Sequence, residues 1–221
     1  MPNNVLQQIR AEIAPYNCQL VAVSKTKPID MILGLYHQNQ RHFGENRVQE
    51  LVEKQGQLPD DIHWHFIGHL QTNKVKYIAP FVHLIHAVDS SKLLKEINKR
   101  AKENNRIIDI LLQFKIAQEA TKHGYSGKDI FNMLEENPLS ALENIRIVGV
   151  MGMATFTNDS NQVELEFTAL QHYFQQLKDR YFSEQESFKE LSMGMSGDYH
   201  LALMHGSTMV RIGSLLFGSR E

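Results

Sequence analysis

Short runs of β-forming residues alternate with stretches in which apolar residues recur at helical spacing, and this alternation restricts the fold more than any other feature. Several of the β-forming runs, such as residues 20–23 and 107–112, are apolar almost throughout. Strands of this kind are buried on both faces, as in a parallel sheet that helices cover. We expect strands at residues 19–24, 41–44, 63–68, 82–88, 107–114, 145–151, 191–194 and 208–212.

These runs predict a β/α barrel. Spread over 221 residues, they leave about 28 residues for each unit, close to the roughly 30 of a βαβ element. The expected fold is therefore a single (β/α)8 TIM barrel, and a doubly wound open sheet is the alternative with the same pattern. Val5, Leu6, Ile9 and Ile13 predict an extra helix before the first strand. No Gly/Ser-rich or Pro-rich linker interrupts the chain, so we expect residues 1–221 to form one domain.

Composition excludes several classes of protein. The 23 Lys and Arg residues nearly balance 25 Asp and Glu residues, which argues against an electrostatic grip on nucleic acid or an anionic membrane. No apolar run approaches the ~18 residues of a membrane span, and the first residues lack the pattern of a secretory signal. Cys18 is the only cysteine and cannot form an internal disulfide, which suits a reducing compartment. We expect a cytoplasmic protein.

In a β/α barrel the chemistry lies at the carboxyl ends of the strands. Lys25 follows the first expected strand, and strand alternation places it on the same face as Val21 and Val23, which is the barrel interior. A partly desolvated lysine has a lowered pKa and supplies the free amine that attacks a carbonyl. The alternative is a solvated lysine at a strand end, like Lys27. The other candidates selected by this rule are residues 45–46, His69, Asp89, Lys115, 151–155, 195–196 and 213–214.

Two turns near the end of the chain predict a phosphate site. Ser196 is placed to cap a helix after the seventh strand, and Gly213 and Ser214 repeat the arrangement after the eighth. Helix N-termini that lie side by side present unpaired amides to an anion, and phosphate sites of such barrels often follow these two strands. Ordinary caps and glycine turns are the alternative.

Arg211 lies within an expected strand between Val210 and Ile212. A buried guanidinium requires a partner. The sequence leaves two interpretations open, which are a core ion pair with a carboxylate such as Glu45, and donation of hydrogen bonds to a ligand at the barrel mouth.

The eleven histidines raise the question of a metal site. His63 and His65 flank Trp64 and share a strand face, whereas His83 and His86 do not. Because the chain has no cysteine partner for them and no HExxH motif, we expect no metal site and place most of these histidines on the polar rim or the surface.

Blocks of residues spread over nearly the whole chain resemble one family. They are residues 23–27, 43–46 with 49–50, 64–74, 191–196 and 206–213. In sequence and order they are similar to the pyridoxal phosphate homeostasis protein family, which is related to the N-terminal barrel of alanine racemase. The resemblance implies a barrel of the alanine racemase type (PLP fold type III) that holds pyridoxal 5′-phosphate (PLP).

The resemblance also implies roles for individual residues. Lys25 matches the lysine that carries PLP as a Schiff base, and Arg211 matches the arginine that faces the pyridine nitrogen. Asn46 lies in a block that lines the same pocket. The family's phosphate contacts map to Ser196, Gly213 and Ser214. The chain departs from the family at Lys115, where members commonly carry asparagine, and at residues 153–155, so the polar lining of the pocket is where it is expected to differ.

The resemblance implies a PLP carrier or buffer rather than an enzyme, with no catalytic residue of its own. An arginine opposite the pyridine nitrogen makes the cofactor a weaker electron acceptor than a carboxylate would. A racemase also needs a second acid or base, which alanine racemase takes from an added domain that we expect this chain to lack. Tyr36, Tyr77, Tyr125 and Tyr199 remain open as such a group.

The expected partners are PLP and PLP-dependent apo-enzymes that receive it, and the expected state is a monomer or weak dimer. A low-activity single-domain amino-acid racemase or decarboxylase is the first alternative function. A Schiff-base aldolase acting on a phosphosugar is the second.

Overall fold

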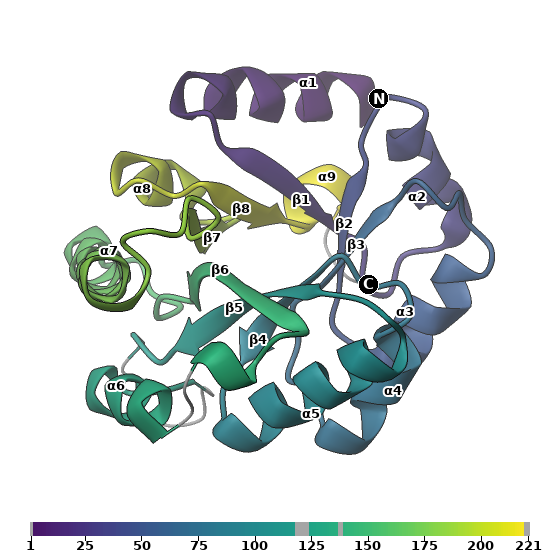
Figure 1. Ribbon diagram of the computed structural model, residues 1–221. Coiled ribbons are helices and arrows are strands. Elements are labelled where there is room, and N and C mark those ends of the chain that lie inside the picture. Colours follow the sequence, from purple (N-terminus) through teal and green to yellow (C-terminus); the bar gives the residue numbers. More distant parts are fainter. Residues whose placement is uncertain (1, 118–123, 137–138, 219–221) are drawn as a thin grey trace.

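The computed structural model describes residues 2–117, 124–136 and 139–218, and its strands form a closed parallel barrel in chain order (Figure 1). The strands are β1 (Gln19–Val23), β2 (His42–Glu45), β3 (His63–Phe66), β4 (Leu84–Val88), β5 (Ile108–Phe114), β6 (Ile145–Gly152), β7 (Glu190–Met195) and β8 (Met209–Ile212). The pairing of β1 with β8 closes the barrel and rules out the open doubly wound sheet.

Helices form a ring around these strands (Figure 1). They are α1 (Pro2–Ile13), α2 (Ile29–Tyr36), α3 (Val48–Gln55), α4 (Val75–Ile78), α5 (Ser91–Glu103), α6 (Gly127–Glu136), α7 (Ser160–Tyr181), α8 (Tyr199–Met204) and α9 (Ser214–Phe217). Short 3₁₀ helices occupy Ala14–Tyr16, Thr72–Lys74 and Leu139–Ala141. Within the described residues, no helix combines the length and apolar composition that a membrane span requires.

The expected strands agree with the observed ones to within two residues at each end. Residues 63–68 form a strand only as far as Phe66, and the chain then passes close to the backbone that follows β2. A Cβ atom at Gly68 would lie 2.4 Å from the carbonyl oxygen of Asn46, so only glycine allows this approach. The extra amino-terminal helix is also confirmed, because Leu6, Ile9 and Ile13 are buried on one side of α1.

The apolar core has two parts. The larger part lies between the strands and the surrounding helices, and Phe167 and Leu170 of α7 belong to it. The smaller part includes residues of several strands whose side chains share the face of Val21, the barrel interior. It consists of Val21, Leu84, Ala87, Leu111, Val148, Met151 and Met209. Polar side chains described below share this interior, so apolar packing fills only part of the barrel.

We expect Gly149→Ala to lower the free energy of unfolding by about 3 kcal/mol or more. A Cβ atom at this position would lie 1.8 Å from the carbonyl oxygen of Glu190, so β6 and β7 would have to separate. Urea denaturation followed by circular dichroism measures the change.

Gly34→Ala is the matched control, because the exposed Gly34 of α2 has no atom within 4 Å of an added Cβ. It should stabilise the protein by about 0.5–1 kcal/mol through helix propensity. A Gly149→Ala protein as stable as the parent would contradict the tight β6–β7 packing.

Candidate functional site

A cavity of about 540 Å³ opens at the carboxyl ends of the strands. This volume lies within the range of small-molecule sites, about 300–1,000 Å³. All the residues that the sequence selected for binding line this one cavity, namely Lys25, Asn46, Ser196, Arg211, Gly213 and Ser214. The other strand-end candidates His69, Asp89 and Lys115 are not among its lining residues.

The pairing of β1 with β8 brings the two ends of the chain together at this cavity. Ala22 lies opposite Ile212 in the register, so Lys25 and Gly213 both follow directly where the two strands end. A Cβ atom at Gly213 would lie 3.2 Å from the carbonyl oxygen of Val23, a tight contact that the absent side chain relieves. Lys25 is half-buried on the cavity wall, on the side of the backbone expected from alternation.

A buried ion pair holds the backbone before Lys25. The Nζ atom of Lys54 lies 2.7 Å from Oε1 of Glu45 and donates to the carbonyl oxygen of Ser24 at 2.7 Å. The Ser24 hydroxyl donates to the same Glu45 oxygen at 2.7 Å. Burial raises the pKa of Glu45, and the hydrogen bonds from Lys54 and Ser24 oppose this shift. Glu45 is therefore committed to Lys54, and the predicted alternative of an ion pair between Glu45 and Arg211 is wrong.

Two further contacts hold the loop that carries Lys25. Glu50 accepts hydrogen bonds from the Thr26 amide at 2.5 Å and from Lys54 Nζ at 2.7 Å. Thr26 has a positive φ of 64°, an uncommon conformation for a β-branched residue, so this contact fixes a strained turn. On the other side, Lys27 Nζ donates to the carbonyl oxygen of Phe217 at 3.1 Å, which ties the loop to α9.

Arg211 is buried beneath the cavity and is held by neutral acceptors. Its Nη1 atom donates to Ser192 Oγ at 2.6 Å, and its Nη2 atom donates to the carbonyl oxygen of Gly152 at 3.0 Å. Burial lowers the pKa of Arg211 to about 10, so the group stays charged at neutral pH. Within the described part of the chain it forms no salt bridge, and its remaining donors can serve an acceptor in the cavity.

The two turns predicted to bind phosphate are joined by a hydrogen bond, because the Gly213 amide donates to Ser196 Oγ at 3.3 Å. The prediction that Ser196 caps a helix is wrong. Asp198 occupies the N-cap position of α8, and its Oδ1 atom accepts a hydrogen bond from the Met195 amide at 2.6 Å. Ser214 begins the four-residue α9. The groups that these two turns offer to an anion are thus hydroxyls and backbone amides, and the helices are too short to add a large dipole.

One side-chain atom on the cavity wall lacks a partner. Oδ1 of Asn46 is buried and has no hydrogen-bond partner among the described residues. A buried amide oxygen of this kind is costly unless a ligand or water donates to it. Independently of the sequence pattern, this atom marks a place on the cavity wall where a ligand donor would be accepted.

Sequence reasoning missed the residues that support the site from behind. Lys54 reads as an ordinary helical lysine paired with Glu50 one turn earlier, and only its contact with β2 shows its role. Glu166 of α7 holds the loop after β6 by accepting from the amide and hydroxyl of Thr155 at 2.6 and 2.7 Å. A charged residue within the apolar face of a predicted helix is the signal that could have identified Glu166.

Two buried histidines continue the hydrogen bonding behind Arg211. Ser192 Oγ lies 3.0 Å from His86 Nδ1, and His86 Nε2 lies 2.9 Å from His65 Nδ1. Both rings are fully buried, and burial lowers the pKa of each well below its ordinary value, so both are neutral at neutral pH. The expectation that most histidines lie on the rim or surface is wrong for these two.

We expect stability to decrease as the pH falls below about 6.5. The pKa values of His65 and His86 in the folded protein lie below those of the unfolded chain, so the unfolded chain binds more protons there. Their contribution is complete above pH 6.5 and is lost with falling pH, by up to about 2 kcal/mol for each ring at pH 5. Urea denaturation at pH 7, 6 and 5 measures it.

His86→Gln should have a shallower dependence, since an amide keeps hydrogen-bonding groups but does not titrate. His172→Ala, which removes an exposed histidine of α7, should leave the dependence unchanged. Equal slopes in all three proteins would show that the buried rings are not the cause.

Comparison with known proteins identifies the family of this chain. Residues 3–221 match the family model of the alanine racemase N-terminal domain. The chain is 39% identical to the pyridoxal phosphate homeostasis protein of Aquifex aeolicus, over 93% of this chain and 89% of the relative. It is 34% identical to the protein of the same name from Schizosaccharomyces pombe, over 98% and 90%.

Solved structures of members of the same family and of alanine racemase share the fold of this chain. PipY of Synechococcus elongatus PCC7942, solved with PLP bound, is 34% identical and superimposes with a TM-score of 0.89 over 99% of this chain and 100% of PipY. Alanine racemase from Bartonella henselae shares the fold, with a TM-score of 0.72, 16% identity and coverage of 97% of this chain and 57% of the racemase. The chain belongs to the pyridoxal phosphate homeostasis protein family, within the wider family of alanine racemase N-terminal domains.

Proposed function

We propose that this protein binds PLP covalently through Lys25 and acts in intracellular PLP homeostasis as a carrier or buffer of the cofactor. The observation that carries the proposal is the convergence on one cavity of a lysine amine, a buried arginine and two turns rich in anion-binding groups. The structure of the relative PipY with PLP bound supports it.

The residues on the wall fit the parts of PLP. PLP supplies an aldehyde that condenses reversibly with an amine and a ring that withdraws electrons. We assign the aldehyde to Lys25, as a Schiff base, and the phosphate to Ser196, Gly213 and Ser214. Arg211 is assigned to the pyridine nitrogen, and the unpartnered Oδ1 atom of Asn46 to a hydrogen-bond donor of the ligand.

The charge of Arg211 supports storage over catalysis. A guanidinium that donates to the pyridine nitrogen disfavours protonation of the ring, because two positive charges would then face each other. An unprotonated ring stabilises a carbanion less well. The contacts to Ser192 and Gly152 hold Arg211 in place, so this influence is built into the barrel.

The cavity wall also lacks a second strong proton carrier. Among the described residues that line it, none is a tyrosine, histidine or cysteine. The tyrosines that the sequence left open as an acid or base are elsewhere, namely Tyr36, Tyr77, Tyr125 and Tyr199. Lys27 and Asp198 do line it, but Lys27 donates to Phe217 and Asp198 accepts from Met195. This wall supports a carrier rather than a racemase or decarboxylase, each of which needs a positioned acid or base.

The proposal extends to location and partners. We place the protein in the cytoplasm, as one PLP-binding domain over residues 1–221 and as a monomer or weak dimer. PLP-dependent apo-enzymes are the proposed recipients of the cofactor. The buried and unpaired Cys18 fits a reducing compartment.

Replacing Lys25 by alanine should abolish covalent PLP binding. After incubation with PLP and borohydride reduction, mass spectrometry should find one cofactor on the parent protein, attached to the peptide that contains Lys25, and none on Lys25→Ala. The physical reason is that the imine bond needs the Lys25 amine.

Lys27→Ala and Lys115→Ala are the controls, because Lys27 lines the same cavity and Lys115 follows β5 outside it. Both should keep the cofactor. Attachment at Lys27, or unchanged labelling of Lys25→Ala, would refute the assignment. Exchange of amino-acid α-protons in deuterated water that depends on Lys25 would favour the racemase alternative.

Ser196→Ala should weaken binding of PLP by about tenfold, the effect of losing one hydrogen bond to a charged group. Affinity for pyridoxal, which lacks the phosphate, should not change. Equilibrium titration of both ligands, followed by absorbance, separates the two effects.

Ser207→Ala is a comparison variant, because the Ser207 hydroxyl is buried and donates to Met193 away from the cavity. Ser207→Ala should leave the ratio of the affinities for PLP and pyridoxal unchanged. An equal loss for PLP and pyridoxal in Ser196→Ala would remove Ser196 from the phosphate site.

A further inference from the structure

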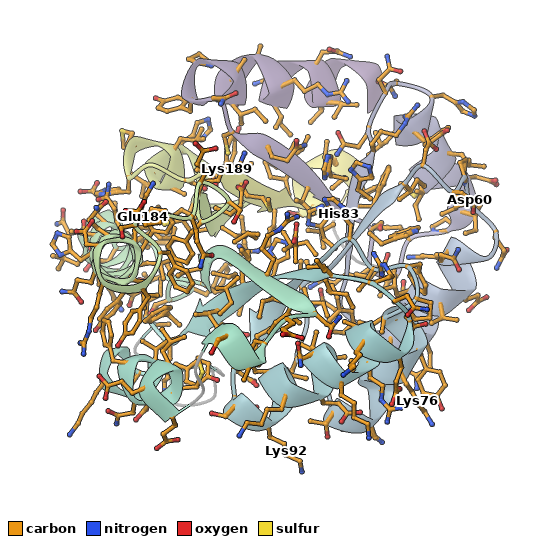
Figure 2. The ribbon with its side chains drawn as sticks, viewed as in Figure 1. Asp60, Lys76, His83, Lys92, Glu184 and Lys189 are labelled. Atoms are coloured by element: carbon orange, nitrogen blue, oxygen red, sulfur yellow. The ribbon has the colours of Figure 1, made fainter. Side chains whose placement is uncertain are left out.

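A second cavity, of about 510 Å³, lies at the opposite end of the barrel, where the strands begin. Three histidines from three neighbouring strands cluster at this end of the barrel, and two of them, His42 and His83, line the cavity. His42 begins β2, His63 begins β3 and is its register partner, and His83 directly precedes β4. Figure 2 shows His83 near the middle of the molecule, inside the ring of helices.

We propose that His42, His63 and His83 form a binding site for a divalent transition-metal ion of the zinc, nickel or copper class. Each histidine offers a ligand nitrogen, and these atoms all lie within 4.8 Å of one another. Imidazole is a preferred ligand of these ions. The sequence analysis expected no metal site, because these ligands come from three separate strands and lack the short spacing of a metal motif.

The distances suit one ion. Two nitrogens bound to the same tetrahedral zinc, each at 2.0–2.1 Å, lie about 3.4 Å apart. His63 Nδ1 and His42 Nε2 are already 3.3 Å apart. The ring of His83 stacks on that of His63 with 4.4 Å between centroids. To reach this spacing the three ligand nitrogens have to approach one another by at most about 1.4 Å, and the stacked rings of His63 and His83, which are exposed, have to turn toward the ion.

His42 has the surroundings of a metal ligand. Its second ring nitrogen, Nδ1, lies 2.9 Å from Nε2 of the buried His65. Metal-bound histidines almost always use the second nitrogen in a hydrogen bond that fixes the ring, and such partners change metal affinity by about 10–100-fold. Through His65, the ligand His42 is tied to His86 and so to the barrel interior.

The charges around this cluster nearly cancel. Its wall includes the carboxylates of Asp109, Glu186 and Glu190 and the cations Arg146 and Lys189. Asp109 binds Arg146 through two hydrogen bonds of 2.7 and 2.8 Å, which neutralises that arginine. Two carboxylates then remain against Lys189 on the wall and Arg106, whose charge also acts on His83, so the charges around the site nearly balance. The open side of the site leaves room for water as a further ligand.

The interior hydrogen bonds determine which nitrogen of each buried histidine carries the proton. Ser192 accepts from Arg211, so its own hydrogen points to His86 Nδ1, the remaining partner among the described residues. His86 must then carry its proton on Nε2, and His65 on Nε2 as well, which donates to His42. In this arrangement His42 Nε2 also carries a proton, and that is the nitrogen facing His63.

A metal ion bound to His42 Nε2 reverses the donor-to-acceptor direction of these hydrogen bonds. His42 must then be protonated on Nδ1, which faces His65 Nε2, and that nitrogen must become an acceptor. His65 and, in turn, His86 change to the Nδ1–H form. Each imidazole still carries one proton on its other nitrogen, and Ser192 Oγ now accepts from both His86 and Arg211, so that the Ser192 hydrogen turns away from His86. Binding at the surface therefore changes the tautomers of two buried rings.

The first test is calorimetric titration of the full chain with zinc or nickel ions. We expect one ion per chain. His63→Ala and His83→Ala should each lower the affinity by more than about 100-fold, beyond the range for an indirect partner. Both residues are exposed, so these variants are expected to fold. His172→Ala, an exposed histidine outside the cluster, is the control and should bind as the parent does.

The second test follows the ring nitrogens of His65 and His86 by ¹⁵N NMR as zinc is added. We expect both rings to change from the Nε2–H to the Nδ1–H form at one equivalent. The proposal would be overturned if the parent protein bound no ion, or if His63→Ala and His83→Ala bound it with the affinity of the parent. Binding that leaves the tautomers of His65 and His86 unchanged would also overturn it, because His42 Nε2 would then not be a ligand.

Discussion

The parallel pairing of β1 with β8 is the contact on which the candidate PLP site depends, because it joins residues almost two hundred positions apart in the chain. Lys25 and Ser214 reach the same cavity only when the barrel is closed. Gly213 makes the closure tight, since any side chain there would press on the carbonyl of Val23. Binding a ligand that contacts both strand ends therefore stabilises the closed barrel, as any ligand that binds only the folded state does.

The buried charges near the cavity, the Glu45–Lys54 ion pair and Arg211, are stabilised in different ways. Glu45 and Lys54 neutralise each other, and their hydrogen bonds serve to hold the loop of Lys25. Arg211 is held by the neutral acceptors of Ser192 and Gly152, and the negative charge of Asp198 offsets the cost of its burial only in part. An uncompensated buried charge is unfavourable. An anionic or electron-rich ligand in the cavity reduces that penalty, so the barrel that holds Arg211 in place also favours the ligand.

The barrel could be predicted from the sequence because β-forming runs alternate with helical ones. The cavity wall could be predicted largely from the rule that the functional residues of such a barrel follow the strand ends. The sequence did not predict contacts between strands and helices. Lys54 has the spacing of a solvent-exposed helical pair with Glu50, and its burial is a tertiary effect. Ser196 and Asp198 are both good cap residues, and the turn geometry decides in favour of Asp198. His86 could not be assigned to the interior, because the register between β4 and β5 shifts just there.

The polar column inside the barrel sets this chain apart from barrels filled by branched apolar residues. His65, His86 and Ser192 are fully buried, and none of their polar atoms is left without a partner. A buried series of polar groups is tolerated only when each group has its hydrogen-bond partners, and the hydrogen bonds of such a series strengthen one another. Its two ends are Arg211, below the candidate PLP cavity, and His42, in the cavity where the strands begin. An unbroken series of hydrogen bonds therefore runs through the barrel interior from the wall of one cavity to the wall of the other, in a space that apolar side chains would otherwise fill.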